Sequence, residues 1–321
     1  MIILGIGGAA HDNSACLVRD GRVTVAIEEE RITRKKHAIG LGMTLGRRYT
    51  QQCCLQVAGV TDDQVDLVGV DDFAYPLAFT YWGDRVRLVN HHLSHAASSY
   101  YVSGYQRAAV LVIDGRGSQH GELAETISYG WADGPDMELT ERVLGLPDEK
   151  DPHFVVENSL GGFYSETTRL IGFGPLNDGK TMGLAPYGTD RYLAEMRRFV
   201  TLKERGRIEM TREQLNGLRE LCEREIARSE GAFGTKADIA GAAQTVLEEA
   251  IMHCVLHARE LTGETRLCLA GGVVLNGVAN YKVLKAGIFQ EIFVPPMPGD
   301  NGTSIGAALY TYHCHMTGGG R

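Results

Sequence analysis

Two histidines four residues apart are the first residues in this sequence that could do chemistry together. His91 and His95 lie within the stretch 89–95, and on a helix this spacing places both imidazoles on one face. Two imidazoles on one face could hold one metal ion. Histidines that cap a helix or face the core are the alternative for this pair alone. His253 and His257 repeat the spacing on a long amphipathic segment with no nearby carboxylate motif, so we interpret them as structural.

Two aspartates beside glycines could complete such a metal site. Asp114 follows the apolar run 110–113 and precedes Gly115, which suits a strand-end carboxylate that meets a metal-bound water or a phosphate. A plain Asp-Gly hairpin turn is the alternative. Asp300 lies in the Pro- and Gly-rich loop 295–302, where a solvated turn is the alternative. Two histidines and one carboxylate with open positions form a recognised mononuclear metal site.

A glycine pair links an expected strand to an expected helix in the second half of the chain. Gly271 and Gly272 follow the apolar run 267–270, and Asn276 comes four residues later. Glycines there permit a nucleoside to approach the backbone, and an Asn side chain can hydrogen-bond ribose or base. Tight packing of the strand on the helix explains the same glycines equally well.

Two basic segments could meet an anion. The run 28–37, which includes Lys36, concentrates positive charge on an acidic protein, and the turn 178–188 places Lys180 between glycines. A lysine from either segment could contact phosphate. The alternatives are a solvated charged face for the first segment and an ordinary loop for the second.

Apolar runs and turn residues predict the elements that position these side chains. A strand ending at Gly7-Gly8 begins a meander, and a similar arrangement returns around the buried strand 108–113, so we expect two related lobes. Further strands are predicted at 14–18, 23–27, 66–70, 86–89, 122–129, 137–143 and 267–270, and helices at 92–101, 237–261 and 276–284.

Composition and charge argue against several classes of protein. The 321 residues carry 40 acidic and 32 basic side chains, and the net charge of −8 opposes attraction to nucleic acid or an anionic membrane. The seven cysteines contain no C-x-x-C pair, which favours a reducing compartment, and no apolar stretch reaches about 18 residues. We therefore predict a cytoplasmic protein that binds neither nucleic acid nor membrane.

Taken in order, these motifs resemble the carbamoyltransferase family of antibiotic and nodulation-factor biosynthesis. The transfer domain of that family is similar to the proteins that install threonylcarbamoyl-adenosine in tRNA. The resemblance covers most of the chain apart from about 189–235, and it runs through residues 7–18, 28–37, 90–98, 114–115, 159–165, 179–188, 270–276 and 295–306.

The resemblance implies an α/β fold of the ASKHA (actin-like ATPase) type, with two lobes of mixed sheet and a nucleotide cleft between them. We expect residues 1–105 to form the N-terminal lobe and 106–321 the C-terminal lobe, with an inserted helical segment at about 189–235.

The same resemblance assigns roles to the candidate residues. His91, His95 and Asp300 would bind one metal ion, typically Fe²⁺, with Asp114 as a further ligand or a phosphate-side partner. The groups around the carbamoyl-adenylate and the acceptor would be His11, Asp12, Lys36, Asp114 and Lys180. The adenine nucleotide, whether carbamoyl-adenylate, AMP or ATP, would contact Gly115, Gly271, Gly272 and Asn276. His11 is our candidate general base because imidazole titrates near neutral pH, and phosphate binding alone is the alternative.

The implied reaction moves a carbamoyl group from carbamoyl-adenylate to a hydroxyl of a small-molecule natural product. Family members usually continue into a YrdC-like domain that makes carbamoyl-adenylate from ATP and carbamoyl phosphate. This sequence contains no equivalent region, so we expect a separate YrdC-like activating protein. An excised domain and a site diverted to another acyl-adenylate are the alternatives. A Mg²⁺-dependent ATPase or phosphotransferase and a noncatalytic nucleotide-binding partner are the alternatives. We expect the loops 75–84 and 189–235 to select the acceptor, whose identity is left open. A homo-oligomeric state is also left open.

Overall fold

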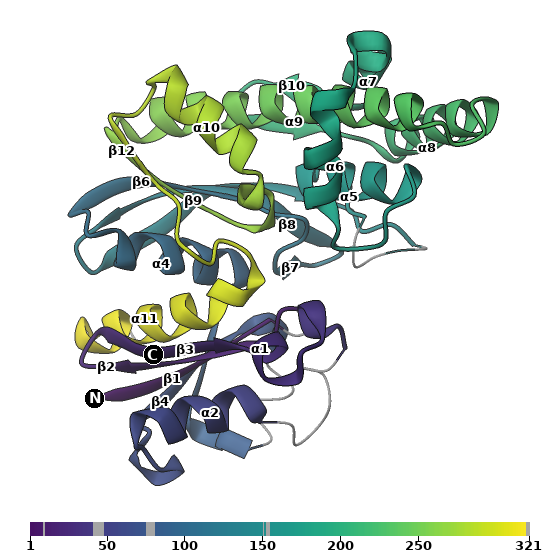
Figure 1. Ribbon diagram of the computed structural model, residues 1–321. Coiled ribbons are helices and arrows are strands. Elements are labelled where there is room, and N and C mark those ends of the chain that lie inside the picture. Colours follow the sequence, from purple (N-terminus) through teal and green to yellow (C-terminus); the bar gives the residue numbers. More distant parts are fainter. Residues whose placement is uncertain (9, 41–47, 75–80, 150, 152–154, 319–321) are drawn as a thin grey trace.

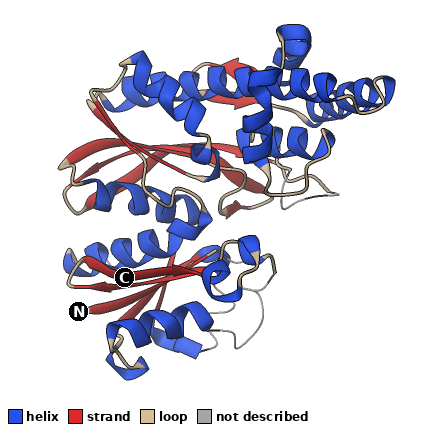
Figure 2. Ribbon diagram, viewed as in Figure 1, coloured by secondary structure: helices blue, strands red, loops and turns tan. Residues whose placement is uncertain are grey.

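Two sheets, with helices between and around them, form the architecture of the computed structural model (Figures 1 and 2). The structure describes residues 1–8, 10–40, 48–74, 81–149, 151 and 155–318. From bottom to top, Figure 1 shows α2 (Tyr49–Ala58), the first sheet, α11 (Thr303–Met316) with α4 (His91–Ser103), the second sheet, and a top layer that includes α9 (Phe233–Thr262). The two sheets therefore face each other across α11 and α4.

The first sheet is built around strand β1. Among the described residues it has five strands in the order β3-β2-β1-β4-β5. Their bounds are β1 Ile2–Gly7, β2 Ser14–Arg19, β3 Arg22–Glu28, β4 Leu67–Asp71 and β5 Val86–Val89. β2 runs antiparallel to β1, whereas β4 runs parallel to it. Helices cover both faces of this sheet, so its central strands are apolar runs rather than alternating patterns.

The second sheet repeats this arrangement around strand β6. In the part of the chain that is described, its order is β13-β12-β6-β8-β7, with β9 paired to β8. The bounds are β6 Arg107–Ile113, β7 Gln119–His120, β8 Leu123–Asp133, β9 Asp136–Gly145, β12 Arg266–Ala270 and β13 Glu291–Phe293. β6 has an antiparallel neighbour, β8, and a parallel neighbour, β12. Each sheet thus has a central strand with one neighbour of each kind, which matches the repeated pattern expected from the sequence.

Helices α4 and α11 cross over between the two sheets. α4 comes before residue 105 but packs on β12 and β6 of the second sheet, and α11 comes near the end of the chain but packs on β1, β4 and β2 of the first. This packing differs from the expected division into residues 1–105 and 106–321. The two helices touch at Gly306, where an added Cβ would lie 1.7 Å from the carbonyl oxygen of Ser94.

Helix α9 forms much of the core above the second sheet. It is long and apolar enough to cross a membrane by length and composition alone, but 67% of its apolar window is buried inside the protein. Its buried side chains include Ile239, Leu247 and Val255. We conclude that α9 is a core helix, slightly longer than the predicted helix 237–261.

The segment at about 189–235 is more varied than the expected helical insertion. It contains helices α7 (Leu193–Met196) and α8 (Arg212–Arg228) and also a two-stranded hairpin, β10 (Thr201–Lys203) with β11 (Arg207–Glu209). In the other loop expected to select the acceptor, residues 75–80 lie outside the described part of the chain.

A buried carboxylate joins α8 to α5 (Leu160–Leu170). Glu166 of α5 is 2% exposed and accepts hydrogen bonds from Arg169 on its own helix and Arg219 on α8. Burial disfavours the charged form of this carboxyl group, but the two arginines outweigh burial and lower its pKa.

Candidate metal centre

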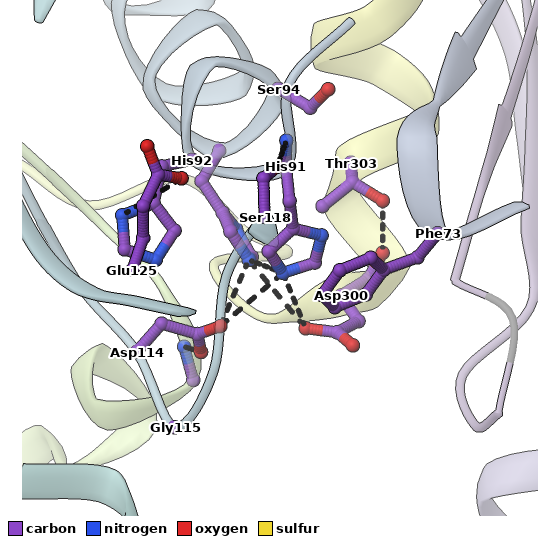
Figure 3. A network of polar contacts seen from close by, with 12 residues as sticks. Phe73, His91, His92, Ser94, Asp114, Gly115, Ser118, Glu125, Asp300 and Thr303 are labelled. Atoms are coloured by element: carbon purple, nitrogen blue, oxygen red, sulfur yellow. Dashed lines mark hydrogen bonds and ion pairs between the residues drawn. The ribbon is translucent and has the colours of Figure 1, made fainter. Parts of the chain in front are cut away.

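Four side-chain donor atoms converge between the two sheets (Figure 3). The Nε2 atoms of His91 and His95 lie 3.2 Å apart. Oδ2 of Asp114 lies 3.2 Å from His91 Nε2 and 3.9 Å from His95 Nε2. Oδ1 of Asp300 lies 3.7 Å and 3.5 Å from the same two nitrogens. The structure therefore brings together the four residues that the sequence proposed as a set.

The spacing of these atoms fits one metal ion at their centre. Bonds of about 2.0–2.2 Å from a metal to imidazole and carboxylate place neighbouring ligand atoms about 3.0–3.6 Å apart. The measured separations of 3.2–3.9 Å are close to this range. Two imidazoles with carboxylates are also a suitable donor set for a divalent transition metal.

Three separate elements deliver the four candidate ligands. His91 and His95 occupy the first turns of α4, whose N-terminus is capped by Asn90 accepting a hydrogen bond from the Leu93 N–H. Asp114 directly follows β6, and Asp300 begins the short turn that leads into α11. The centre therefore depends on how α4, β6 and α11 are packed together.

Burial and negative charge compete at the centre. The rings of His91 and His95 are fully buried, which disfavours a charged imidazole. For His91 the carboxylates of Asp71, Asp114 and Asp300 outweigh burial and raise the pKa well above its usual value. Burial also opposes ionisation of Asp114, but the adjacent histidines lower its pKa. Such a concentration of carboxylates favours a bound cation, which would neutralise part of this charge.

His11 reaches the edge of this centre from the loop after β1. Its Nε2 lies 3.7 Å from Asp300 Oδ2, and its Nδ1 lies 3.0 Å from Asp12 Oδ2. Asp12 also pairs with His37, whose Nδ1 is 2.9 Å from Asp12 Oδ1. Burial opposes protonation of His11, but Asp300 and Asp12 outweigh it and raise the pKa to about 9. This direction differs from the near-neutral titration on which its role as a base was predicted.

The glycine pair lies directly beside Asp114. Gly271 has φ +103°, and a Cβ there would lie 2.3 Å from the carbonyl oxygen of Ile113. The Gly272 N–H donates a hydrogen bond to Asp114 Oδ1 over 2.7 Å. Close approach of the chain to its own backbone therefore explains Gly271. The Gly272 N–H thus holds Oδ1 of Asp114, while Oδ2 faces the two histidines.

Asn276 is used by the protein itself. Its side-chain amide pairs with that of Gln244 through bonds of 2.8 and 3.0 Å, and its oxygen also caps α10 (Gly277–Ala286) at the Ala279 N–H. These contacts engage both ends of the amide that the sequence assigned to the nucleotide. Sequence reasoning could not have found the partner Gln244, which lies 32 residues away on α9.

The turn at Gly115 meets the N-terminus of α5. Gly115 O accepts a hydrogen bond from the Ser159 hydroxyl, and a Cβ at Gly161 would lie 2.6 Å from the Gly115 Cα. The first turn of α5 thus lies against the strand end that carries Asp114, and a helix N-terminus favours an anion.

The two predicted lysines and the second histidine pair are not part of the group of four donor atoms. Lys36 and Lys180 are exposed, and Lys180 Nζ lies 5.8 Å from the centroid of the Phe173 ring. None of the contacts described joins either lysine to the four donor atoms. His253 and His257 bond to separate partners, the carbonyl oxygen of Lys203 and the carboxylate of Glu141. That second pair therefore does not converge.

Several residues around the centre escaped sequence reasoning. Asp71 lies at the end of β4 and its Oδ2 is 2.8 Å from His91 Nδ1, while the ring of Phe73 stacks on His91. Ser118 and His37 also bond within the network. The available signal was an aspartate at the end of an apolar strand, which Asp71 shares with Asp114.

Comparison with known proteins identifies the relatives of this sequence. Residues 77–309 match the family model described as carbamoyltransferase N-terminus. Nodulation protein NolNO of Sinorhizobium fredii is 35% identical over 93% of this chain and 46% of its own length. An uncharacterized protein of Synechocystis, sll1178, is 31% identical over 98% of this chain and 57% of its own. The chain thus spans about half the length of the curated relatives it matches.

Solved structures show the same fold at low sequence identity. Full-length HypF in its phosphate- and nucleotide-bound form has a TM-score of 0.61 and 14% identity, over 98% of this chain and 55% of that one. Component A of the (R)-2-hydroxyglutaryl-CoA dehydratase of Acidaminococcus fermentans has a TM-score of 0.55 and 16% identity, over 97% and 98% of the two chains. These likenesses confirm the predicted ASKHA-type α/β fold.

Proposed function

The chain belongs to the carbamoyltransferase family, and from that premise we propose that it transfers a carbamoyl group from carbamoyl-adenylate to a hydroxyl of a small molecule. The observation that carries the proposal is the convergence of two imidazoles and two carboxylates beside the turns of an ASKHA-type fold. In the reaction the acceptor oxygen bonds to the carbamoyl carbon, the bond from that carbon to the phosphate oxygen breaks, and the hydroxyl proton leaves to a base. The products are an O-carbamate and AMP.

His91, His95, Asp114 and Asp300 would hold a single divalent metal ion, and we propose Fe²⁺ because two histidines with carboxylates suit it. Bound there, the ion would supply Lewis acidity towards the oxygens of the mixed anhydride. The second oxygen of Asp114 is held by the Gly272 N–H, so the carboxylate presents one oxygen in a fixed direction. This preorganisation lowers the cost of building the site at the moment of reaction.

The charge state of His11 supports a role on the phosphate side. Asp300 and Asp12 raise the pKa of His11, which favours the protonated ring, and a protonated ring donates hydrogen bonds from both nitrogens. Nδ1 faces Asp12, which leaves Nε2 directed towards the centre. We propose that Nε2–H donates to a phosphate oxygen of the adenylate and later stabilises the charge of the departing AMP.

The adenylate itself would come from a separate activity. We propose that a YrdC-like protein makes carbamoyl-adenylate from ATP and carbamoyl phosphate, and that the cleft of this chain receives it. The AMP portion would give the protein a handle for orienting the carbamoyl carbon, which free carbamoyl phosphate lacks.

The test is direct transfer from the activated donor. The purified chain is loaded with Fe²⁺ without oxygen and incubated with synthetic carbamoyl-adenylate and a panel of hydroxylated small molecules. Mass spectrometry should then detect a carbamoyl adduct together with AMP. The His95→Ala variant should lose the adduct, whereas His253→Ala, a matched change in the second histidine pair, should retain it.

Two results would contradict this function. One is the absence of any adduct above the spontaneous reaction across the panel. The other is equal adduct formation by the wild-type protein and His95→Ala. Phosphate released from ATP and Mg²⁺ alone would instead favour an ATPase or phosphotransferase.

A further inference from the structure

Three consecutive residues at the end of β4 restrain one of the two histidines of the metal centre, two by direct contact and one through a serine. Asp71, Asp72 and Phe73 belong to the first sheet and the turn that follows it, whereas His91 begins a helix packed on the second sheet. Each of the three residues reaches His91 by a different route. We call residues 71–73 the His91 clamp.

The first contact fixes the tautomer of the ring. Asp71 is fully buried, and its Oδ2 lies 2.8 Å from Nδ1 of His91. A carboxylate at this distance accepts a hydrogen bond from the ring nitrogen, so the proton of the pair lies on Nδ1 of His91. Nε2, on the opposite side of the ring, is then the atom that faces Asp114 and Asp300.

The second contact fixes the plane of the ring. Phe73 stacks on His91 with ring centroids 4.4 Å apart and an angle of 18° between the planes (Figure 3). Its own N–H donates to Asp71 Oδ1 over 3.1 Å. The acid and the aromatic ring therefore hold each other while they hold the imidazole.

The third contact fixes the backbone of His91. The N–H of His91 donates to Ser118 Oγ over 2.8 Å, and the Ser118 hydroxyl donates to Asp72 Oδ2 over 2.6 Å. Asp72 thus acts on the start of α4 through one serine. Together the three contacts restrain the nitrogen, the plane and the main chain of a single side chain.

We propose that the His91 clamp positions His91 for metal binding, so that the first sheet sets the geometry of a ligand carried by the second lobe. Partners that orient a ligating imidazole commonly contribute 10- to 100-fold in metal affinity, and Asp71 occupies that place here. The inference rests on the metal site of the proposed function, and it adds residues that touch neither metal nor substrate. They are positioning residues.

The experiment measures metal affinity directly. Co²⁺ is titrated into the full chain against a chelator of known affinity, and the visible absorption spectrum of the bound ion is recorded. The variants are Asp71→Asn, Asp71→Ala and Phe73→Leu. Asp238→Asn is the matched control. Asp238 lies on α9, away from the metal centre; it is 9% exposed and accepts hydrogen bonds from Thr189.

We expect both Asp71 variants to raise the dissociation constant for Co²⁺ by about 10- to 100-fold, and to alter the absorption spectrum because the ring is free to turn. Phe73→Leu should raise it by about 2- to 10-fold, since stacking contributes less than a charged hydrogen bond. Asp238→Asn should keep the wild-type constant and spectrum. A purely structural role for Asp71 would lower thermal stability and leave both unchanged.

Wild-type affinity and spectrum in folded Asp71→Asn and Asp71→Ala would overturn the proposal. If both Asp71 variants fail to fold, Phe73→Leu decides, and a wild-type constant in that variant overturns the proposal. Failure of the metal site itself would look different, because His95→Ala would then bind Co²⁺ as well as the wild-type protein does.

Discussion

A single methyl group at Gly306 should push α11 away from α4, the helix that carries His91 and His95. In the wild-type structure a Cβ at this position would lie 1.7 Å from Ser94 O, 2.7 Å from Ser94 C and 2.8 Å from Ser98 N. A carbon and a carbonyl oxygen in contact are about 3.3 Å apart at closest. In Gly306→Ala, α11 and α4 must therefore move apart by about 1.5 Å at this point.

The cost of that movement should be large because the obstacle is main chain. Side chains can rotate away from an added methyl group, but the backbone of α4 cannot. The free energy of unfolding should therefore fall by an amount near the upper end of the range of about 1–3 kcal/mol that is common for overpacking. The same shift changes the metal centre, because His95 follows Ser94 and Asp300 leads into α11. Metal–ligand distances tolerate only about 0.2 Å, so affinity should fall as well.

Urea unfolding and Co²⁺ titration of the same preparations test both effects. Gly234→Ala is the control: this glycine lies in α9 and an added Cβ meets nothing within 4 Å. It should leave metal binding unchanged and raise the free energy of unfolding by up to about 1 kcal/mol, since Ala favours a helix. A Gly306→Ala protein with unfolding free energy and Co²⁺ affinity like those of the wild type would refute the reasoning.

Four further predictions follow from contacts described above. His91→Ala and Asp300→Ala should lose bound metal while His253→Ala retains it, and metal analysis of the folded proteins would show the reverse if the wrong pair was chosen. Gly272→Val should weaken adenine nucleotide binding in calorimetry, because its Cβ would lie 2.9 Å from Asp114 Oδ1, and equal affinity would argue against a nucleotide there. Given ATP and carbamoyl phosphate, the chain alone should release no pyrophosphate, and a YrdC-like protein should restore carbamoyl transfer. Glu166→Gln should be less stable than wild type at pH 7. Because the pKa of Glu166 is lowered in the folded protein, its charge stabilises the fold at pH values above the unfolded pKa of about 4.3. The difference in unfolding free energy between the two proteins should therefore shrink as the pH falls below about 4, and a constant difference would contradict this.

The four residues that converge between the sheets could be found in the sequence because each has a local signature. The spacing of His91 and His95 encodes one helix face, and Asp114 and Asp300 each stand next to a glycine in a turn. Strand and helix positions followed from apolar runs in the same way. For example, the predicted strand 86–89 has the bounds of β5.

Residues whose role depends on distant partners could not be found in that way. Asp71 reads as an ordinary acid at a strand end until the fold brings it to His91, and Asn276 reads as a ligand contact until the fold brings it to Gln244. Packing also decided where α11 belongs, since a helix near the end of a chain carries no local mark of the sheet it will cover. His11 was found by its type, but its pKa depends on Asp300, which only the fold places beside it.

The position of α11 has a consequence for how the protein is made. Synthesis releases β1 to β5 long before α11, with the whole second sheet in between, and at 5–20 residues per second the delay is on the order of ten seconds or more. The side chains of Ile3, Cys16 and Val18 pack against Ala308 and Leu309 in the finished protein, and until α11 is made they lack this cover. Gly5 and Gly69, whose lack of a side chain lets α11 approach the sheet closely, are also uncovered by α11 during that time. The first sheet of the nascent chain thus exposes an apolar face while the ribosome is still making α11. During that time the face can bind a chaperone or form wrong contacts.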